Sequence, residues 1–214
     1  MRKLPAVTPA LTLAAALFAQ IMFVQTMFAQ TKAPAPAAKA PAKQPWQIER
    51  PAGEFVIHMT DGSQKLLTSY RGKVVVMAFM YTTCTHCQAT AHLLAKINTE
   101  YANKGVQILG VVIDAGGQQG IPTFLKITGA NFPVGFSSPE QAIKFLHGPS
   151  DGWFIPMLAF IDRHGMIRFE NIVTDTDDGT AGKWIEAQDV NIPKEIDKYL
   201  KAPVSAATKQ APKS

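Results

Sequence analysis

Two cysteines, Cys84 and Cys87, are the residues of this chain best suited to chemistry, and only two residues separate them. They follow Val74 to Tyr81, a run of β-branched and aromatic residues that is typical of a buried strand. After them, apolar residues recur every three or four positions, which predicts an amphipathic helix opened by the cysteines. A helix N-terminus offers unpaired N–H groups and a positive dipole end, so it favours Cys84 as a thiolate. Cys87 lies one turn on, close enough to form a disulfide with it.

Four interpretations of this Cys-x-x-Cys pair are open: a redox-active dithiol, half of a structural zinc site, an inert disulfide, or a site for copper or another metal. Zinc needs two further ligands, yet the chain has no other cysteine and its five histidines show no paired ligand spacing. An inert bridge across so short a loop constrains the unfolded chain little. We therefore favour a redox-active pair, and we expect no metal and no cofactor besides the Cys84–Cys87 disulfide.

Residues 1–30 are typical of an export signal. A basic start, Met1-Arg2-Lys3, precedes the uncharged and mainly apolar stretch from Leu11 to Ala29. That stretch is also about long enough to span a bilayer, so a cleaved signal peptide and a retained membrane anchor both remain open. In either case the rest of the chain is expected to cross the membrane into the periplasm or another extracytoplasmic space.

Composition divides the remainder into a linker, one domain and a tail. Residues 31–46 are rich in Pro, Ala and Lys, which predicts an extended spacer. Residues 201–214 have a similar composition and are predicted to be disordered. Residues 47–200 form a segment long enough for one well-buried core.

The basic balance of the chain belongs to its ends. The formal net charge is +5, but eight of the 21 basic residues lie in residues 1–46 and 201–214. The 13 that remain face 16 acidic residues, which gives the central segment a net charge of −3. We therefore expect no nucleic-acid partner, because such a partner would need a basic face on the domain itself.

The order of the expected elements indicates an α/β fold. Residues 54–59 and 64–67 are expected to form strands, and 74–81, the cysteine helix and 106–113 then form a strand–helix–strand unit with parallel strands. A Gly/Gln loop follows at 114–120, then a helix at 121–128, a strand at 134–136, a helix at 139–146, a hairpin of 157–162 with 166–172, and a closing helix at 193–200. We predict a thioredoxin-like fold: a central mixed β-sheet flanked by helices, with an N-terminal β addition and an insertion after the second parallel strand.

The chain from about Gly53 to Leu200 resembles the exported thioredoxin-like thiol-disulfide oxidoreductases of the TlpA/ResA type. The cysteine pair is a moderately specific motif by itself, but the ordered set of matching segments, together with an export signal, is a strong one. These segments are Phe55–Gly62, Tyr70–Val74, Cys84–Cys87, Gly129–Val134, Ile155-Pro156 and Phe160–Arg168. The resemblance implies an enzyme that exchanges disulfides with protein thiols.

The resemblance also implies further site residues. Pro156 would be a cis-proline beside the active site, and the backbone of Ile155 before it would pair with a substrate peptide lying across the disulfide. Thr83 stands where the family usually has a Trp before the first cysteine, so we assign Thr83 to substrate binding.

Two acids that usually serve the second cysteine are absent. Classical thioredoxins carry a buried acid where Ala78 stands here, and TlpA/ResA-type proteins carry a Glu where Thr90 stands. His86 is the compensating residue that we expect to act in catalysis, because an imidazole beside Cys84 can stabilise a thiolate. The Thr-His pair between the cysteines is similar to that of strongly oxidising DsbA-type proteins. An exposed His86 without any role is the alternative.

The leading hypothesis is an exported thiol-disulfide oxidoreductase whose partners are protein thiols and disulfides, such as apocytochrome c or a copper-site protein, and a membrane redox partner. The runner-up is a copper-binding metallochaperone, since the segment Met80–Cys87 also resembles Sco-type proteins. That reading needs a distant histidine, for which His147 or His164 is available. A thiol peroxidase is disfavoured because Tyr81 replaces the Thr expected three residues before the reactive cysteine.

Overall fold

The computed structural model describes residues 47–202. The expected export signal and the linker at 31–46 lie outside the described residues, as does the expected tail from residue 203 onward. The last helix ends at Lys201.

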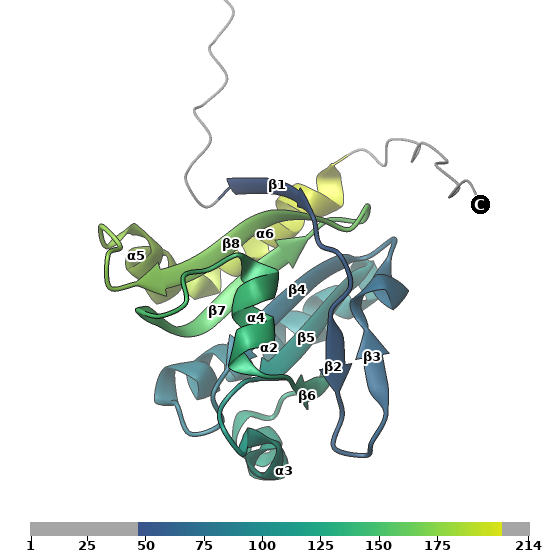
Figure 1. Cartoon of the computed structure of the whole chain (residues 1–214). Helices are drawn as coiled ribbons and strands as arrows, with labels where there is room; N and C mark the ends of the chain where they lie inside the picture. The colour runs from purple at the N-terminus through teal and green to yellow at the C-terminus, as the bar shows by residue number, and fades with distance from the viewer. Residues whose placement is uncertain (1–46, 203–214) are drawn as a thin grey trace, which may run out of the picture. The chain divides into compact units, whose positions relative to one another are not determined.

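One mixed sheet organises the described residues, with the strand order β1-β8-β7-β4-β5-β6-β2-β3 (Figure 1). Strands β4, β5 and β6 are parallel, and every other pairing between neighbours is antiparallel. The N-terminal strands β1 and β3 form the two edges of the sheet. The strands are β1 (Gln47–Pro51), β2 (Val56–His58), β3 (Gln64–Leu66), β4 (Val74–Met80), β5 (Val106–Val112), β6 (Val134–Phe136), β7 (Trp153–Ile161) and β8 (Met166–Thr174).

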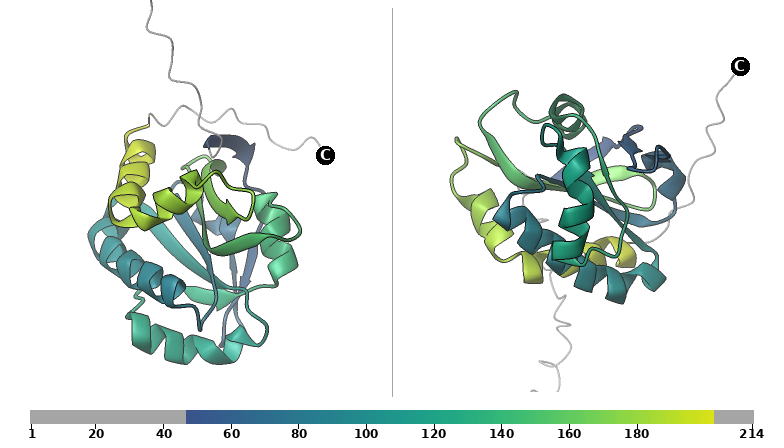
Figure 2. Two further views of the ribbon diagram at one scale, coloured as in Figure 1. Left: turned by 90° about the vertical axis from the view of Figure 1, so that its left-hand side faces the viewer. Right: turned by 90° about the horizontal axis from the view of Figure 1, so that it is seen from below.

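Helices cover both faces of this sheet. Helix α4 packs on one face, while α2, α5 and α6 pack on the other (Figures 1 and 2). Helix α3 adds buried side chains to the same core cluster as α2. The helices are α2 (Thr85–Tyr101), α3 (Gly117–Thr128), α4 (Pro139–Leu146), α5 (Thr180–Glu186) and α6 (Gln188–Lys201), with 3-10 turns η1 (Leu67–Tyr70) and η2 (Ala102–Lys104).

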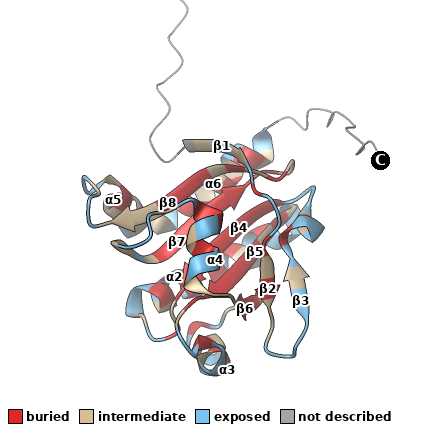
Figure 3. Ribbon diagram, in the orientation of Figure 1, coloured by how far each residue is buried: buried red, intermediate tan, exposed pale blue. Residues whose placement is uncertain are grey.

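The apolar run that begins at Val74 is the central strand β4, and all seven of its residues are buried (Figure 3). Successive side chains of a strand point to opposite faces. Val74, Val76, Ala78 and Met80 therefore join the core under α2 and α6, while Val75, Met77 and Phe79 join the core under α4. A strand covered on both faces needs apolar side chains at every position, which explains why the run has no polar alternation.

The sequence-based expectations for the main elements are confirmed. Strands β4 and β5 are parallel, and β7 and β8 form the expected hairpin. Helix α4 begins after Ser138, whose Oγ accepts the backbone N–H of Gln141 at 3.2 Å. The fold is therefore the predicted α/β arrangement, with an N-terminal β addition and with α3, β6 and α4 inserted between β5 and β7.

Several boundaries were wrong. The expected loop at 114–120 ends early, because α3 begins at Gly117, and α6 begins at Gln188 rather than Pro193. Gly117 in the added turn of α3 is buried, and Ile192 in the added turn of α6 joins the core cluster of α2 and β4, so tertiary packing overrides the weak propensity of Gly and Pro for helix. Strand β7 starts four residues earlier than expected, and β1 and α5 were not anticipated.

Candidate active site

The two cysteines lie where β4 gives way to α2. Cys84 is the N-cap residue of α2, with φ −79° and ψ 120°, and its Sγ accepts the backbone N–H of Cys87 at 3.4 Å. Cys84 is half-buried and Cys87 is fully buried, and the two thiols are not bridged in this structure. The helix geometry therefore presents one thiol to solvent and shields the other behind it.

Burial sets the chemistry of the Cys87 thiol. Removal from water raises its pKa, and the Cys84 side chain and the negative charge of Asp114 raise it further. A hydrogen bond with the backbone of Tyr81 lowers the pKa; it is weaker than burial but stronger than the influence of Cys84 or of Asp114. Cys87 is thus kept as a thiol near neutral pH, which leaves attack on a substrate to the exposed Cys84.

Pro156 and Ile155 lie at the same end of the sheet as the cysteines. Strands β7 and β4 pair with Met157 opposite Phe79, so Pro156 is level with the end of β4, from which the chain leads to Cys84. The Ile155–Pro156 peptide bond is cis, as the family resemblance implied, and Pro156 is buried. The side chains of Ile155 and Cys84 both pack against the core cluster that contains Cys87.

Thr83 and His86 are both exposed beside Cys84. His86 occupies the first turn of α2, and no hydrogen bond or ion pair joins its ring to another of the described residues. His86 therefore lies at the site, but none of the described residues 47–202 holds its ring in one orientation by a hydrogen bond.

The two positions that lack the usual acids are both buried. Ala78 is enclosed within β4, and Thr90 donates its hydroxyl hydrogen to Gln188 Oε1 at 2.8 Å. Sequence reasoning found no carboxylate near Cys87, but the structure places Asp114 close enough to act on its charge. A signal for Asp114 was present, because it follows β5, and parallel strands such as β4 and β5 end at the same edge of a sheet.

An aromatic contact lies at the end of β4, just before the cysteines. Tyr81 and Trp153 meet edge to face with ring centroids 6.5 Å apart, and the neighbouring Phe154 is 54% exposed. Trp153 and Phe154 directly precede Ile155 in β7, so both rings adjoin the expected substrate position.

No group of three His, Cys, Asp or Glu side chains in the described part of the chain is arranged to hold a metal ion. His164 lies in the β7–β8 turn, and because Ile161 pairs with Val75 that turn is at the opposite end of β4 from Cys84. A seven-residue strand spans roughly 20 Å, so this histidine cannot join the two thiols. His147, the other candidate, is the C-cap residue of α4 and lines a cavity with Arg50, Phe55 and Phe145 but without either cysteine.

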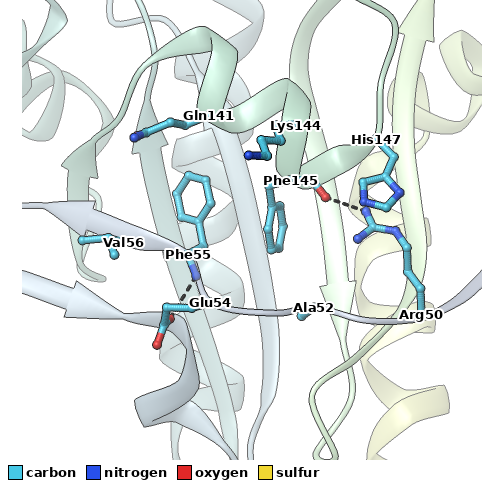
Figure 4. Close-up of a pocket in the computed structure, with 9 residues that line it drawn as sticks. All are labelled: Arg50, Ala52, Glu54, Phe55, Val56, Gln141, Lys144, Phe145 and His147. Atoms are coloured by element: carbon cyan, nitrogen blue, oxygen red, sulfur yellow. Dashed lines mark hydrogen bonds between the residues drawn. The ribbon is translucent and has the colours of Figure 1, made fainter.

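A separate cavity of about 360 Å³ lies between the β1–β2 connection and α4 (Figure 4). Arg50, Lys144 and His147 line it together with the rings of Phe55 and Phe145. Arg50 donates a 2.6 Å hydrogen bond to the carbonyl oxygen of Phe145 and forms an ion pair with the buried Glu170. The Arg50–Glu170 pair joins β1 to β8. Neither cysteine lines the cavity, so it is separate from the candidate active site.

A thioredoxin-like sheet with a dithiol at the start of a helix defines a class of enzymes, the thiol-disulfide oxidoreductases. The sequence profile of the Redoxin family matches residues 31–185. The chain belongs to this family, as a thioredoxin-like thiol-disulfide oxidoreductase of the TlpA/ResA type.

Curated relatives carry the same activity in their names. Thiol-disulfide oxidoreductase ResA of Geobacillus thermodenitrificans (strain NG80-2) is 28% identical over 126 residues, which are 58% of this chain and 68% of the relative. The ResA protein of Bacillus anthracis is 26% identical over 126 residues, with 58% and 69% of the two chains covered.

Solved structures share the fold. A thiol:disulfide interchange protein of the thioredoxin family from Chlorobium tepidum TLS has a TM-score of 0.54 at 18% identity, covering 72% of this chain and 97% of that one. The thioredoxin domain of a thiol-disulfide oxidoreductase from Bacteroides vulgatus has a TM-score of 0.53 at 15% identity, again covering 72% and 97%. At these identities the likeness establishes the fold alone.

Among residues 47–202, no helix is both long and apolar enough to cross a bilayer.

Proposed function

We propose that this protein is an exported oxidoreductase that exchanges disulfides with protein thiols through Cys84 and Cys87. The observation that carries the proposal is the asymmetry of the pair: a half-exposed thiol at the N-cap of α2 and a fully buried thiol one turn later. Such an arrangement gives one sulfur access to a substrate and reserves the other for the second step.

In the reducing direction, the Cys84 thiolate attacks a substrate disulfide and displaces one substrate sulfur, which leaves as a thiolate and takes a proton from water. Cys87 then loses its proton and attacks Sγ of Cys84 in the mixed disulfide, which releases the second substrate sulfur. Two electrons pass from the dithiol to the substrate, and the Cys84–Cys87 disulfide remains. The oxidising direction runs through the same mixed disulfide in reverse.

Ile155 and Pro156 form one wall of the proposed substrate groove, with Thr83 on the other side of Cys84. An extended peptide pairs with the backbone of Ile155 and lies across the two sulfurs. The exposed ring of Phe154 adds apolar surface beside this path, which suits an unfolded polypeptide with an apolar side chain near its cysteine. His86 acts in this proposal by stabilising the Cys84 thiolate. No metal and no cofactor beyond the disulfide take part.

Residues 1–30 direct the domain out of the cytoplasm, and residues 31–46 separate it from the membrane. An extracytoplasmic enzyme of this kind needs a membrane redox partner to restore its dithiol or its disulfide. Apocytochrome c or a copper-site protein is the substrate that we propose, since each presents cysteines that must be held in one redox state.

A trapping experiment tests the proposal. The Cys87→Ser variant, expressed with its native N-terminal segment, should accumulate in the periplasmic fraction as mixed disulfides with other proteins, because the resolving thiol is gone. The Cys84→Ser variant should not. If neither variant, or only Cys84→Ser, forms such adducts, the assignment of roles is wrong.

A further inference from the structure

Asp114 and Thr82 form a closely fitted pair beside the thiols. Asp114 follows β5, and its Oδ1 accepts the backbone N–H of Thr82 at 3.2 Å while its Oδ2 accepts the Thr82 hydroxyl at 2.7 Å. Thr82 is only 7% exposed and lies two residues before Cys84. One carboxylate therefore satisfies both donors of a buried residue in the turn that leads to the reactive thiol.

Two glycines of α3 make room for this pair. A Cβ atom at Gly117 would lie 2.4 Å from Asp114 Oδ1, and one at Gly120 would lie 2.7 Å from Thr82 Oγ1. Both distances are well below van der Waals contact, so α3 can pack here only with glycine at these two positions. The packing explains why a glycine-rich segment follows β5, where the sequence alone indicated a loop.

Gln88 completes the connection from the other side of the cysteine pair. Its Nε2 donates a 2.9 Å hydrogen bond to the carbonyl oxygen of Thr82. Thr82 precedes Cys84 and Gln88 follows Cys87, so the Gln88–Thr82 hydrogen bond links the two ends of the Cys-x-x-Cys segment, and Asp114 holds the Thr82 end.

We propose that Asp114 is a positioning residue for the thiol pair: it holds the turn before Cys84 through Thr82, and its negative charge acts on the buried Cys87 during the second, resolving step. This inference rests on the proposed exchange reaction. It assigns a role to a carboxylate that stands at neither of the positions where the resemblance led us to look, Ala78 and Thr90.

The charge acts by repulsion. Two titratable groups, Cys84 at the N-cap of α2 and Asp114 after β5, raise the pKa of the Cys87 thiol, whereas a backbone hydrogen bond of Tyr81 at the end of β4 lowers it. A carboxylate nearby disfavours a second negative charge and so raises the pKa of Cys87, in the same direction as burial. Once Cys84 is part of a mixed disulfide it no longer carries charge. Repulsion by Asp114 then adds to the free energy needed to ionise Cys87 before it attacks the mixed disulfide.

The test follows the two steps separately with 5,5′-dithiobis(2-nitrobenzoate). Attack by Cys84 releases one thionitrobenzoate, and attack by Cys87 on the resulting adduct releases a second as the protein disulfide forms. The rate of the second release against pH reports the ionisation of Cys87. In Asp114→Asn, which keeps an oxygen for Thr82 but removes the charge, the midpoint should move to lower pH by on the order of one unit, and the second release should be up to about tenfold faster near pH 7.

Thr82→Val separates charge from hydrogen bonding. It retains the carboxylate and loses the hydroxyl bond, so the midpoint should stay while the melting temperature falls. Gly117→Ala provides a second variant should Asp114→Asn fail to fold: displacement of the carboxylate by the new methyl group should shift the midpoint in the same direction. Gly182→Ala is its matched control, because no atom lies within 4 Å of a Cβ there.

The role of Asp114 would be overturned if the pH midpoint of the second release were the same in the wild type and in a folded Asp114→Asn or Gly117→Ala variant. This holds even if the two releases occur in the expected order. Failure of the proposed exchange reaction looks different, since the first release would then be absent or would come from Cys87. The two failures are therefore distinguishable in one set of traces.

Discussion

The hydroxyl of Thr90 lies 2.8 Å from the side-chain oxygen of Gln188, and the hydrogen bond between them joins α2 to the first turn of α6. Thr90 is fully buried and sits one turn beyond Cys87. A neutral pair thus fills the position at which TlpA/ResA-type proteins are expected to carry a glutamate, and it ties the cysteine helix to the last helix of the domain.

Thr90→Val should lower the free energy of unfolding by about 1 kcal/mol, because the shape is kept and a buried hydrogen bond is lost. Urea denaturation followed by circular dichroism measures the change. Thr123→Val, at an exposed position of α3, is the matched control and should change stability by no more than about 0.5 kcal/mol. Equal effects of the two variants would show that the Thr90–Gln188 bond contributes nothing.

Alkylation should distinguish the two thiols. In the reduced protein near neutral pH, iodoacetamide should modify Cys84 and leave Cys87 untouched, since Cys87 is buried and its pKa is raised. Peptide mass spectrometry over a time course locates the label. Labelling of Cys87 before Cys84 would reverse the assigned roles. Unfolding in urea before labelling is the control, and both cysteines should then react at similar rates.

The redox poise should differ from that of thioredoxin. We expect the Cys84–Cys87 couple to be clearly less reducing than roughly −270 mV, because His86 and the N-terminus of α2 both favour the reduced, thiolate form. His86→Ala should make the couple more reducing. Equilibration with glutathione buffers measures both potentials, and His92→Ala provides a control on the same helix. If His86→Ala and His92→Ala both leave the potential unchanged, His86 is only a surface residue.

Stability should depend on pH through Glu170. Burial raises the pKa of this carboxyl from 4.5 to about 7, although the Arg50 guanidinium opposes the shift. Between pH 4.5 and about pH 7 the Glu170 carboxyl therefore keeps its proton in the folded state and has lost it in the unfolded state. The contribution of this group to stability is fully present below about pH 4.5 and is lost as the pH rises through 7.

The expected loss is on the order of 1 to 3 kcal/mol between pH 5 and 8. Urea titrations at several pH values measure it. Glu170→Gln, which cannot titrate, should lack this component of the pH dependence, whereas Glu100→Gln on the exposed face of α2 should retain it. A wild-type curve that rises over this range would mean that the ion pair with Arg50 outweighs burial.

The fold was predictable from the sequence where a strand or helix has a local pattern of residue types that identifies it. The uninterrupted apolar run of β4, the parallel strand β5 one helix later, and the Ser138-Pro139 start of α4 are local patterns with a direct structural reading. Strand β1 and helix α5 lack such patterns, since β1 forms by pairing with β8 at the sheet edge and α5 by packing Trp184 against Phe169 of β8. Contacts with residues far along the chain decide such elements.

The amino-acid sequence by itself determined the reactive pair, because Cys84 and Cys87 are one helical turn apart and the strand before them ends at that point. Tertiary structure alone decided which groups surround the pair. Asp114, Gln188 and Trp153 lie tens of residues from the cysteines along the chain, and the crossover from β4 to β5, the return of α6 and the antiparallel strand β7 bring them there. Charge and burial act through space, so the protonation of Cys87 depends on neighbours that sequence spacing does not reveal.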